Sequence, residues 1–119
     1  MKADAAAEVL YNSYHNRVDY EGVMYMDVVS RVKIYDKDKA SDYLNKEISI
    51  YIGGANKEKL LELKAFTYNF EDGKIKTTKV ERDSKFKSTE DKNYNITKFA
   101  FPEVKNGSVL EYSYTIETP

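Results

Sequence analysis

The alternation of side-chain character over residues 23–35 is the feature that most constrains the fold of this chain. Successive side chains of a β-strand point to opposite faces of a sheet, so a period of two residues indicates a strand. This segment therefore predicts a long strand with one dry face and one mixed face. The dry face would comprise Met24, Met26, Val28, Ser30, Val32 and Ile34, and the mixed face Tyr25, Asp27, Val29, Arg31, Lys33 and Tyr35.

Shorter strand-like segments recur at roughly ten-residue spacing, with turn residues between them. The clearest turn is Asp72-Gly73, because Asp-Gly supplies the positive φ angles that a two-residue hairpin turn needs. The pattern predicts an all-β fold, an antiparallel β-sandwich of about seven to eight strands, with an open barrel as the alternative. The further predicted strands cover residues 11–20, 48–52, 60–70, 75–80, 94–101 and 108–117.

Three segments have weaker patterns. Asp4 is placed to cap the N-terminus of a short helix or turn over residues 5–10. Residues 40–45 are expected to form either one helical turn or a loop, and residues 82–93 either a long loop or a weak edge strand. The sequence thus predicts one or two short helical turns at most.

The length of 119 residues is typical of one domain, and we expect a single β-sandwich domain over residues 1–119. Its last predicted strand runs almost to Pro119, which suggests a domain cut from the N-terminal part of a longer protein. The turn before that strand contains Pro102 and Gly107. Proline fixes φ and glycine tolerates positive φ, so both residues are expected to be structural.

Composition excludes several classes of function. The 19 basic and 20 acidic residues give a net charge of −1, so there is no global positive field to hold nucleic acid. No apolar run approaches the roughly 18 residues of a membrane span, so direct membrane insertion is not expected. The N-terminal residues lack the apolar core of a signal peptide. The absence of cysteine excludes disulfides, cysteine-ligated zinc and thiol nucleophiles.

Candidates for catalysis and metal binding are few. His15 is the single histidine, and no Gly-x-Ser-x-Gly motif accompanies it, so it is predicted to be a solvent-facing strand residue and the domain not to be an enzyme. The segment from Asp36 to Glu47 partly matches a calcium-binding loop, with Asp38 also in register, but it lacks the central glycine. We expect a solvated turn there and no cofactor, with ion binding by this segment left open.

The most basic stretch covers residues 74–87. On a strand its basic side chains would be divided between two faces, and Phe86 is the single aromatic residue among them, which is unfavourable for base stacking. We interpret the stretch as a solvated edge hairpin protected from pairing by lysines, and predict no nucleic-acid partner.

Tyrosine is unusually frequent, with 11 residues and no tryptophan. Tyr112 and Tyr114 share an apolar strand face with Leu110 and Ile116, so both rings are expected in the core. Tyr25 and Tyr35 share the mixed face with Arg31, which makes these three residues the candidate exposed binding face. Aromatic rings stack on sugars, so a glycan ligand, or a peptide, is the alternative function predicted for the domain.

Several motifs resemble those of a known family, in the right order. Residues 5–11 (AAAEVLY) resemble its Ala-x-Ala-x-Val-Leu segment, and residues 28–35 (VVSRVKIY) its Val-x-Ile-Leu strand. An Ile-rich strand and a Leu-rich strand follow, and residues 70–74 (FEDGK) match its Asp-Gly-Lys hairpin. Residues 101–112 (FPEVKNGSVLEY) match its ending, Phe-Pro-x-Val-x-x-Gly-x-Val-Ile-Glu-Tyr. Over nearly its whole length the chain resembles the domain of uncharacterised function that precedes transglutaminase-like domains in exported bacterial proteins, most often from the Bacteroidetes.

This resemblance implies a non-catalytic accessory domain that is structural or presents a partner or substrate. Its partner would be an adjacent C-terminal, papain-like Cys-His-Asp transglutaminase-like domain of the parent chain. The family carries no catalytic residue on this domain, and its usual setting implies the periplasm or cell envelope. The sequence departs from the pattern at Asn106, where proline is commoner, and in its lysine-rich middle.

Overall fold

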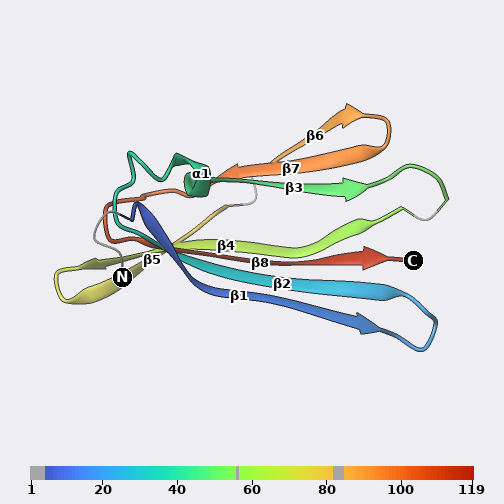
Figure 1. Cartoon of the computed structure of the whole chain (residues 1–119), viewed down its shortest axis with the longest axis horizontal. Helices are drawn as coiled ribbons and strands as arrows, with labels where there is room; N and C mark the ends of the chain where they lie inside the picture. Colours follow the sequence, from blue (N-terminus) through green and yellow to red (C-terminus); the bar gives the residue numbers. More distant parts are fainter. Residues whose placement is uncertain (1–4, 56, 82–84) are drawn as a thin grey trace.

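The chain forms two antiparallel β-sheets that pack against each other, as predicted (Figure 1). This computed structural model describes residues 5–55, 57–81 and 85–119. Within them the elements are β1 (Ala7–Val18), β2 (Met24–Ile34), α1 (Ser41–Leu44), β3 (Asn45–Tyr51), β4 (Lys59–Glu71), β5 (Lys74–Lys79), β6 (Phe86–Asp91), β7 (Tyr94–Ala100) and β8 (Val109–Thr118).

The larger sheet has the strand order β1-β2-β8-β4-β5 and the smaller sheet the order β3-β7-β6. The last strand, β8, is central in the larger sheet, where it pairs antiparallel with β2 on one side and β4 on the other. The hairpins β1–β2 and β4–β5 therefore meet only through β8. One short helix, α1, leads into β3 at the edge of the smaller sheet.

The core lies between the sheets and draws on both of them. Val32 and Ile34 of β2 lie with Leu110 of β8 on the larger sheet, and they pack with Ile48 and Phe99 of the smaller sheet. The predicted dry face of residues 24–34 is confirmed from Val28 onward, where every second side chain is buried. Met24, the first residue of the strand, is half-exposed.

The structure corrects one prediction and decides two alternatives. The helix or turn expected over residues 5–10 is wrong, because β1 begins at Ala7 and pairs with Ile34 across the hairpin. Backbone hydrogen bonds from residues 35 and 36 to the carbonyl of Ala6 hold this segment extended, and such pairing overrides the helix propensity of alanine. Residues 41–44 form the helical turn, and residues 86–91 form an edge strand.

The connection from β7 to β8 consists of two successive turns. Glu103 follows Pro102 with φ of 56°, and Gly107 has φ of 96°. The amide of Gly107 donates a hydrogen bond of 2.6 Å to the carbonyl of Ile34, which attaches the second turn to the end of β2. Buried Asn69 donates to the carbonyl of Glu103 at 2.8 Å and accepts from the hydroxyl of Ser108. The turn is therefore fixed to both strands that flank β8.

Replacing Gly107 by valine should destabilise the fold. A Cβ at Gly107 would meet no atom within 4 Å, so the cost comes from backbone strain at φ of 96° and not from a clash. We expect Gly107→Val to lower the free energy of unfolding by about 1–3 kcal/mol in urea denaturation. Ser49→Val, at an exposed position of β3, is the control and should change it by less than about 0.5 kcal/mol. Equal stability of the two variants would contradict this account of the turn.

Candidate functional site

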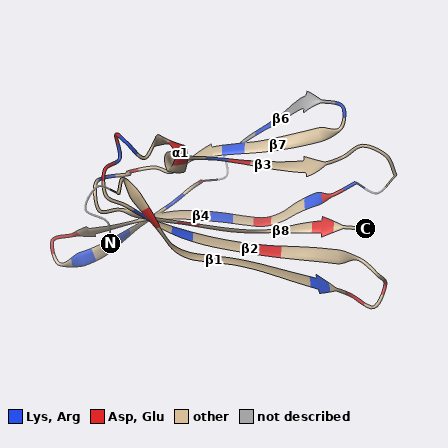
Figure 2. Cartoon of the chain, in the orientation of Figure 1, with Lys and Arg blue, Asp and Glu red and all other residues tan. Residues whose placement is uncertain are grey.

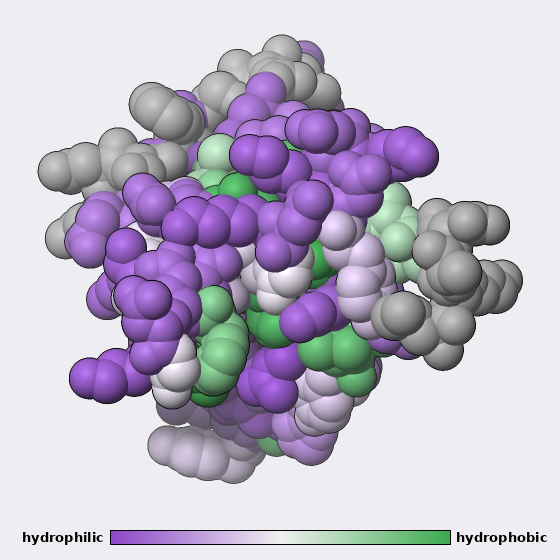
Figure 3. Space-filling view, turned by 90° about the vertical axis from the view of Figure 1, so that its left-hand side faces the viewer, coloured by the Kyte–Doolittle hydropathy of each residue, from purple (hydrophilic) through white to green (hydrophobic). Residues whose placement is uncertain are grey.

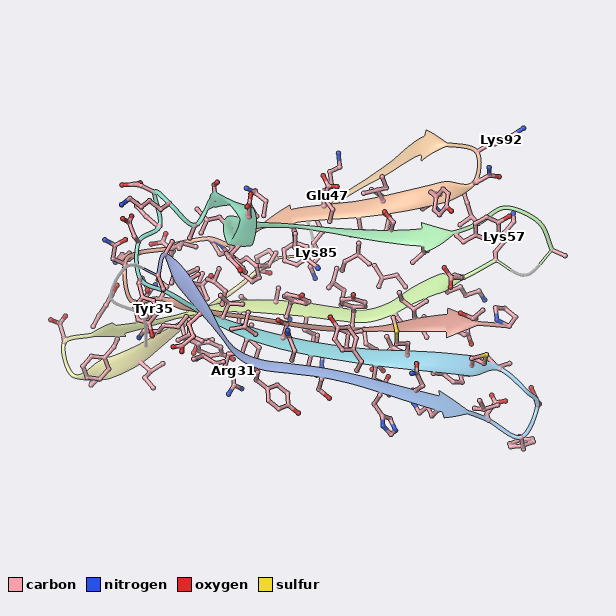
Figure 4. All side chains as sticks on the ribbon, viewed as in Figure 1. Arg31, Tyr35, Glu47, Lys57, Lys85 and Lys92 are labelled. Atoms are coloured by element: carbon pink, nitrogen blue, oxygen red, sulfur yellow. The ribbon has the colours of Figure 1, made fainter. Side chains whose placement is uncertain are left out.

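The outer face of the larger sheet, which points away from the smaller sheet, carries the three predicted binding residues. Tyr25 and Arg31 lie on this face of β2, and Tyr35 follows its end; Figure 4 shows Arg31 projecting away from the smaller sheet. Six residues of extended chain separate Tyr25 from Arg31, which is about 20 Å. The structure thus places the three residues on one face without bringing them together into one site.

Arg31 belongs to a compact network with β8 and β4 that is centred on Glu111. Its guanidinium contacts the Glu111 carboxylate at 2.6 Å, and the Tyr68 hydroxyl donates to the other carboxylate oxygen at 2.7 Å. Burial opposes ionisation of Glu111, but the hydrogen bonds from Arg31 and Tyr68 outweigh it and hold the pKa of Glu111 below its usual range. Burial, together with the same carboxylate, raises the pKa of Tyr68. Glu111 is therefore a charged structural acceptor.

A second network surrounds Asp27 towards the other end of β2. Asp27 accepts hydrogen bonds from Arg17 at 2.9 Å and from the Thr115 hydroxyl at 2.6 Å. The hydrogen bond from Arg17, followed by that from Thr115, lowers the pKa of Asp27. The Arg17 guanidinium also lies 4.3 Å from the centre of the Tyr25 ring, and the Tyr25 hydroxyl donates to Glu117. One face of this ring is therefore already covered by a cation.

Tyr35 is also engaged within the chain. Its hydroxyl donates a hydrogen bond of 2.8 Å to the Glu8 carboxylate of β1. This bond, followed by burial, raises the pKa of Tyr35. The polar groups of the outer face mainly pair with one another, and Figure 2 shows acidic and basic segments interspersed along the strands of both sheets.

A group of large apolar side chains interrupts this charged face at the β4–β5 end. Phe70 and Ile75 are direct cross-strand partners, and they are 76% and 70% exposed. Phe66 and Tyr68 stack along β4 with ring centres 6.1 Å apart and continue the group. Phe66, Tyr68, Phe70 and Ile75 are called the hairpin patch below. In the end-on view, hydrophobic residues gather at the centre of a hydrophilic surround (Figure 3).

The hairpin patch was not among the binding residues predicted from the sequence. The signal was present, because Asp72-Gly73 sets a tight turn and the residues one step outside its flanking pair, Phe70 and Ile75, must then be opposite each other. Their alternation with polar residues would have placed them on one face. The pattern does not indicate which face of the hairpin is covered by the smaller sheet, so the exposure of Phe70 and Ile75 could not be predicted from it.

An open groove separates the two sheets on the side of β1 and β3. Its cavity of about 230 Å³ has an apolar floor that includes Val32 and Leu110. The Lys46 ammonium lies 4.8 Å from the centre of the Tyr112 ring at its wall, and Ser30 donates to Asn12 at 2.6 Å nearby. This region is called the interlayer groove. Its lining residues are Val9, Asn12, Tyr14, Ser30, Val32, Asp42, Tyr43, Asn45, Lys46, Phe101, Leu110 and Tyr112.

The calcium-like segment does not converge on one point. Asp36 accepts a hydrogen bond from the amide of Asp38 in the turn, whereas Glu47 lies in β3 and forms an ion pair with Lys98 at 3.6 Å. Among the side chains that the structure describes, there is no group of three or more histidine or acidic residues arranged to hold a metal ion. His15 lies exposed on β1, opposite Asp27.

The basic stretch of residues 74–87 is divided by the fold. Its first part is β5 at the edge of the larger sheet, and Lys87 is on β6 at the edge of the smaller sheet. Residues 82–84 of this stretch lie outside the described part of the chain. In the part that is described, no helix is long and apolar enough to cross a membrane.

Comparison with known proteins gives a fold relationship. No family model and no curated protein matches the sequence. The structure is similar to the crystal structure of "a putative protease from Parabacteroides distasonis ATCC 8503", with a TM-score of 0.78 and 15% sequence identity. The match covers 96% of this chain and 23% of that protein, so this chain corresponds in length to about a quarter of it. At this identity the likeness establishes a shared fold.

The outer-face networks predict a sensitivity to acid. Asp27 and Glu111 have pKa values below their usual range in the folded chain, so their contribution to stability is present above their unfolded pKa and is lost as the pH falls through the folded one. We expect the melting temperature to fall between about pH 5 and pH 2, and Arg31→Met to flatten that fall because it removes a donor to Glu111. Lys57→Met, in an exposed loop (Figure 4), is the control. Identical pH profiles for the two variants would contradict the assignment.

Proposed function

We propose that this chain is a non-catalytic accessory domain that docks on a transglutaminase-like or protease domain of the same polypeptide. The hairpin patch is the observation that carries the proposal. Phe70 and Ile75 are large apolar side chains, paired across two strands and more than two-thirds exposed. Contiguous apolar surface of this kind, surrounded by polar groups, is typical of an interaction site.

The chemistry of the remaining face is consistent with a structural role. The carboxylates of Asp27 and Glu111 are each held ionised by an arginine and by one hydroxyl. A general acid or base needs a pKa near the working pH, and these two groups are shifted away from it. Neither network therefore supplies the proton transfer that an active site would require.

The size relationship with the Parabacteroides protein supports an accessory role. A unit with this fold occupies 23% of that longer chain. The family resemblance of residues 101–112 points the same way, to a domain that precedes a Cys-His-Asp catalytic domain in an exported protein. Location in the periplasm or cell envelope is part of this proposal.

The proposal is tested on the protein encoded by the complete gene. The coding sequence beyond Pro119 should specify a domain with a Cys-His-Asp set. Phe70→Thr combined with Ile75→Thr should then weaken the affinity of this domain for the separately produced catalytic domain by at least about tenfold, as loss of two central apolar contacts does at interfaces. Isothermal titration calorimetry would measure it.

The matched control for that experiment is Tyr20→Thr. Tyr20 is 98% exposed in the turn between β1 and β2, distant in the chain from the hairpin patch. It should leave the affinity unchanged. A gene without a catalytic domain after Pro119, or equal affinities for the double variant and the control, would overturn the accessory role.

The interlayer groove favours a second candidate function, binding of a glycan or an extended peptide. Its wall presents the Tyr43 ring beside polar groups of Asn12 and Lys46, a combination that suits a ligand with both ring faces and hydroxyls. We expect Tyr43→Ala to abolish any signal on a glycan or peptide array, and Tyr25→Ala and Tyr35→Ala to leave it intact because those rings are engaged on the outer face. A blank array for the unmodified chain would dismiss this candidate.

A further inference from the structure

Strand β1 is an edge strand whose outward backbone groups have no partner among the described strands. It is long, and five of its large apolar side chains are 45–64% exposed. An edge of this kind is a template for pairing with another strand, and proteins usually block it with lysine or proline. These exposed side chains are Val9, Leu10, Tyr11, Tyr14 and Val18.

The other edges of the two sheets are protected in that way. Strand β5 has three lysines among its six residues, and β3 and β6 each contain one, Lys46 and Lys87. Strand β1 has no lysine and no proline, and its two charged residues, Glu8 and Arg17, stand near its opposite ends. Figure 2 shows this pattern directly, with β1 uncharged between an acidic segment near its start and a basic one near its end.

We infer that β1 pairs antiparallel with β1 of a second copy of this chain. The charge pattern is what selects a second copy as the occupant. In an antiparallel pair of identical strands, a residue near one end lies opposite a residue near the other end. Glu8 of each copy therefore lies opposite Arg17 of the other, which gives two Glu8–Arg17 pairs per dimer. Opposite charges placed directly across two strands stabilise their pairing.

A bulge in β1 places the Glu8 and Arg17 side chains on the same face of the strand, as this register requires. The β1–β2 pairing shifts between Val9 and Tyr11, which leaves Leu10 as the extra residue. Glu8 and Arg17 are opposite the outer-face residues Lys33 and Tyr25 of β2, so both point to the outer face. Without the bulge they would point to opposite faces and could not meet across a flat, two-fold symmetric sheet.

The register that follows is specific. Ser13 lies opposite Ser13 on the two-fold axis, Tyr11 faces His15, and Asn12 faces Tyr14, with each pair on one face. Beyond the bulge, Glu8 faces Arg17, and Ala7 faces Val18. A slip of two residues would separate the charges, so one alignment is favoured over its neighbours. The dimer would join two five-stranded sheets edge to edge, and it stands independently of the proposed accessory function.

The two-fold position gives a direct test, since the chain contains no cysteine. Ser13→Cys places two thiols opposite each other in the dimer, within disulfide distance for facing residues of an antiparallel pair. Under mild oxidation we expect it to form a covalent dimer at least about tenfold faster than Ser49→Cys, the matched serine on the edge strand β3. Equal rates for the two variants, measured by non-reducing electrophoresis, would overturn the proposed register.

A charge exchange tests the same interface in solution without any new thiol. Sedimentation velocity over a concentration series should show dimer formation by the unmodified chain, and Arg17→Glu or Glu8→Arg should each weaken it by about tenfold through like-charge pairs. The double exchange, Glu8→Arg with Arg17→Glu, should restore it. Melting curves would confirm that each variant is folded, because both residues also have partners within the chain. A chain that stays monomeric up to about millimolar concentration would overturn the proposal.

Discussion

The pairing of β8 with both β2 and β4 is the interaction on which the rest of the structure depends. The β1–β2 and β4–β5 hairpins are each closed by short turns, but they have no strand pairing with one another. Strand β8 supplies both of their missing partners, and its inward-facing Leu110 completes the core between the sheets. The turn that precedes it is bonded to Ile34 of one hairpin and Asn69 of the other.

The same strand organises the outer face. Its outward-facing acidic residues, Glu111 and Glu117, accept hydrogen bonds from Arg31 and Tyr25 of β2, and Glu111 also accepts one from Tyr68 of β4. Each pair also spans a strand boundary, so the charges reinforce the order of the sheet. Partly exposed ion pairs contribute little individually, and their effect here is to fix the side chains that line the face. Beside these paired polar groups, Phe70 and Ile75 of the hairpin patch remain exposed apolar side chains.

Much of the fold was predictable because long strands carry their own periodicity. The alternation of residues 24–34 predicted β2 and its buried face, and Asp72-Gly73 predicted the β4–β5 hairpin. The start of β1 was missed because an alanine-rich segment carries no strand signal of its own; its strand partners are Ile34, opposite Ala7, and the amides of Tyr35 and Asp36, which donate to the carbonyl of Ala6. The pattern placed Tyr25, Arg31 and Tyr35 on one face but not their partners, which lie up to 92 positions away in sequence. The interlayer groove could not be predicted from the sequence, because it depends on how two sheets of unequal width overlap.

Strand β8 is the last strand of the two sheets to be synthesised, and this order has a consequence for folding. Both hairpins are synthesised before the strand that joins them. The hydrogen bond from Tyr25 to Glu117 can therefore form only when translation of the domain is almost complete. During that interval the apolar inward faces of β2 and β4 remain exposed to water and can make non-native contacts. The larger sheet therefore cannot complete its native pairing until β8 has been synthesised, and non-local pairing of this kind folds slowly. Until β8 emerges, the edges of β2 and β4 that it will occupy are therefore open to non-native pairing.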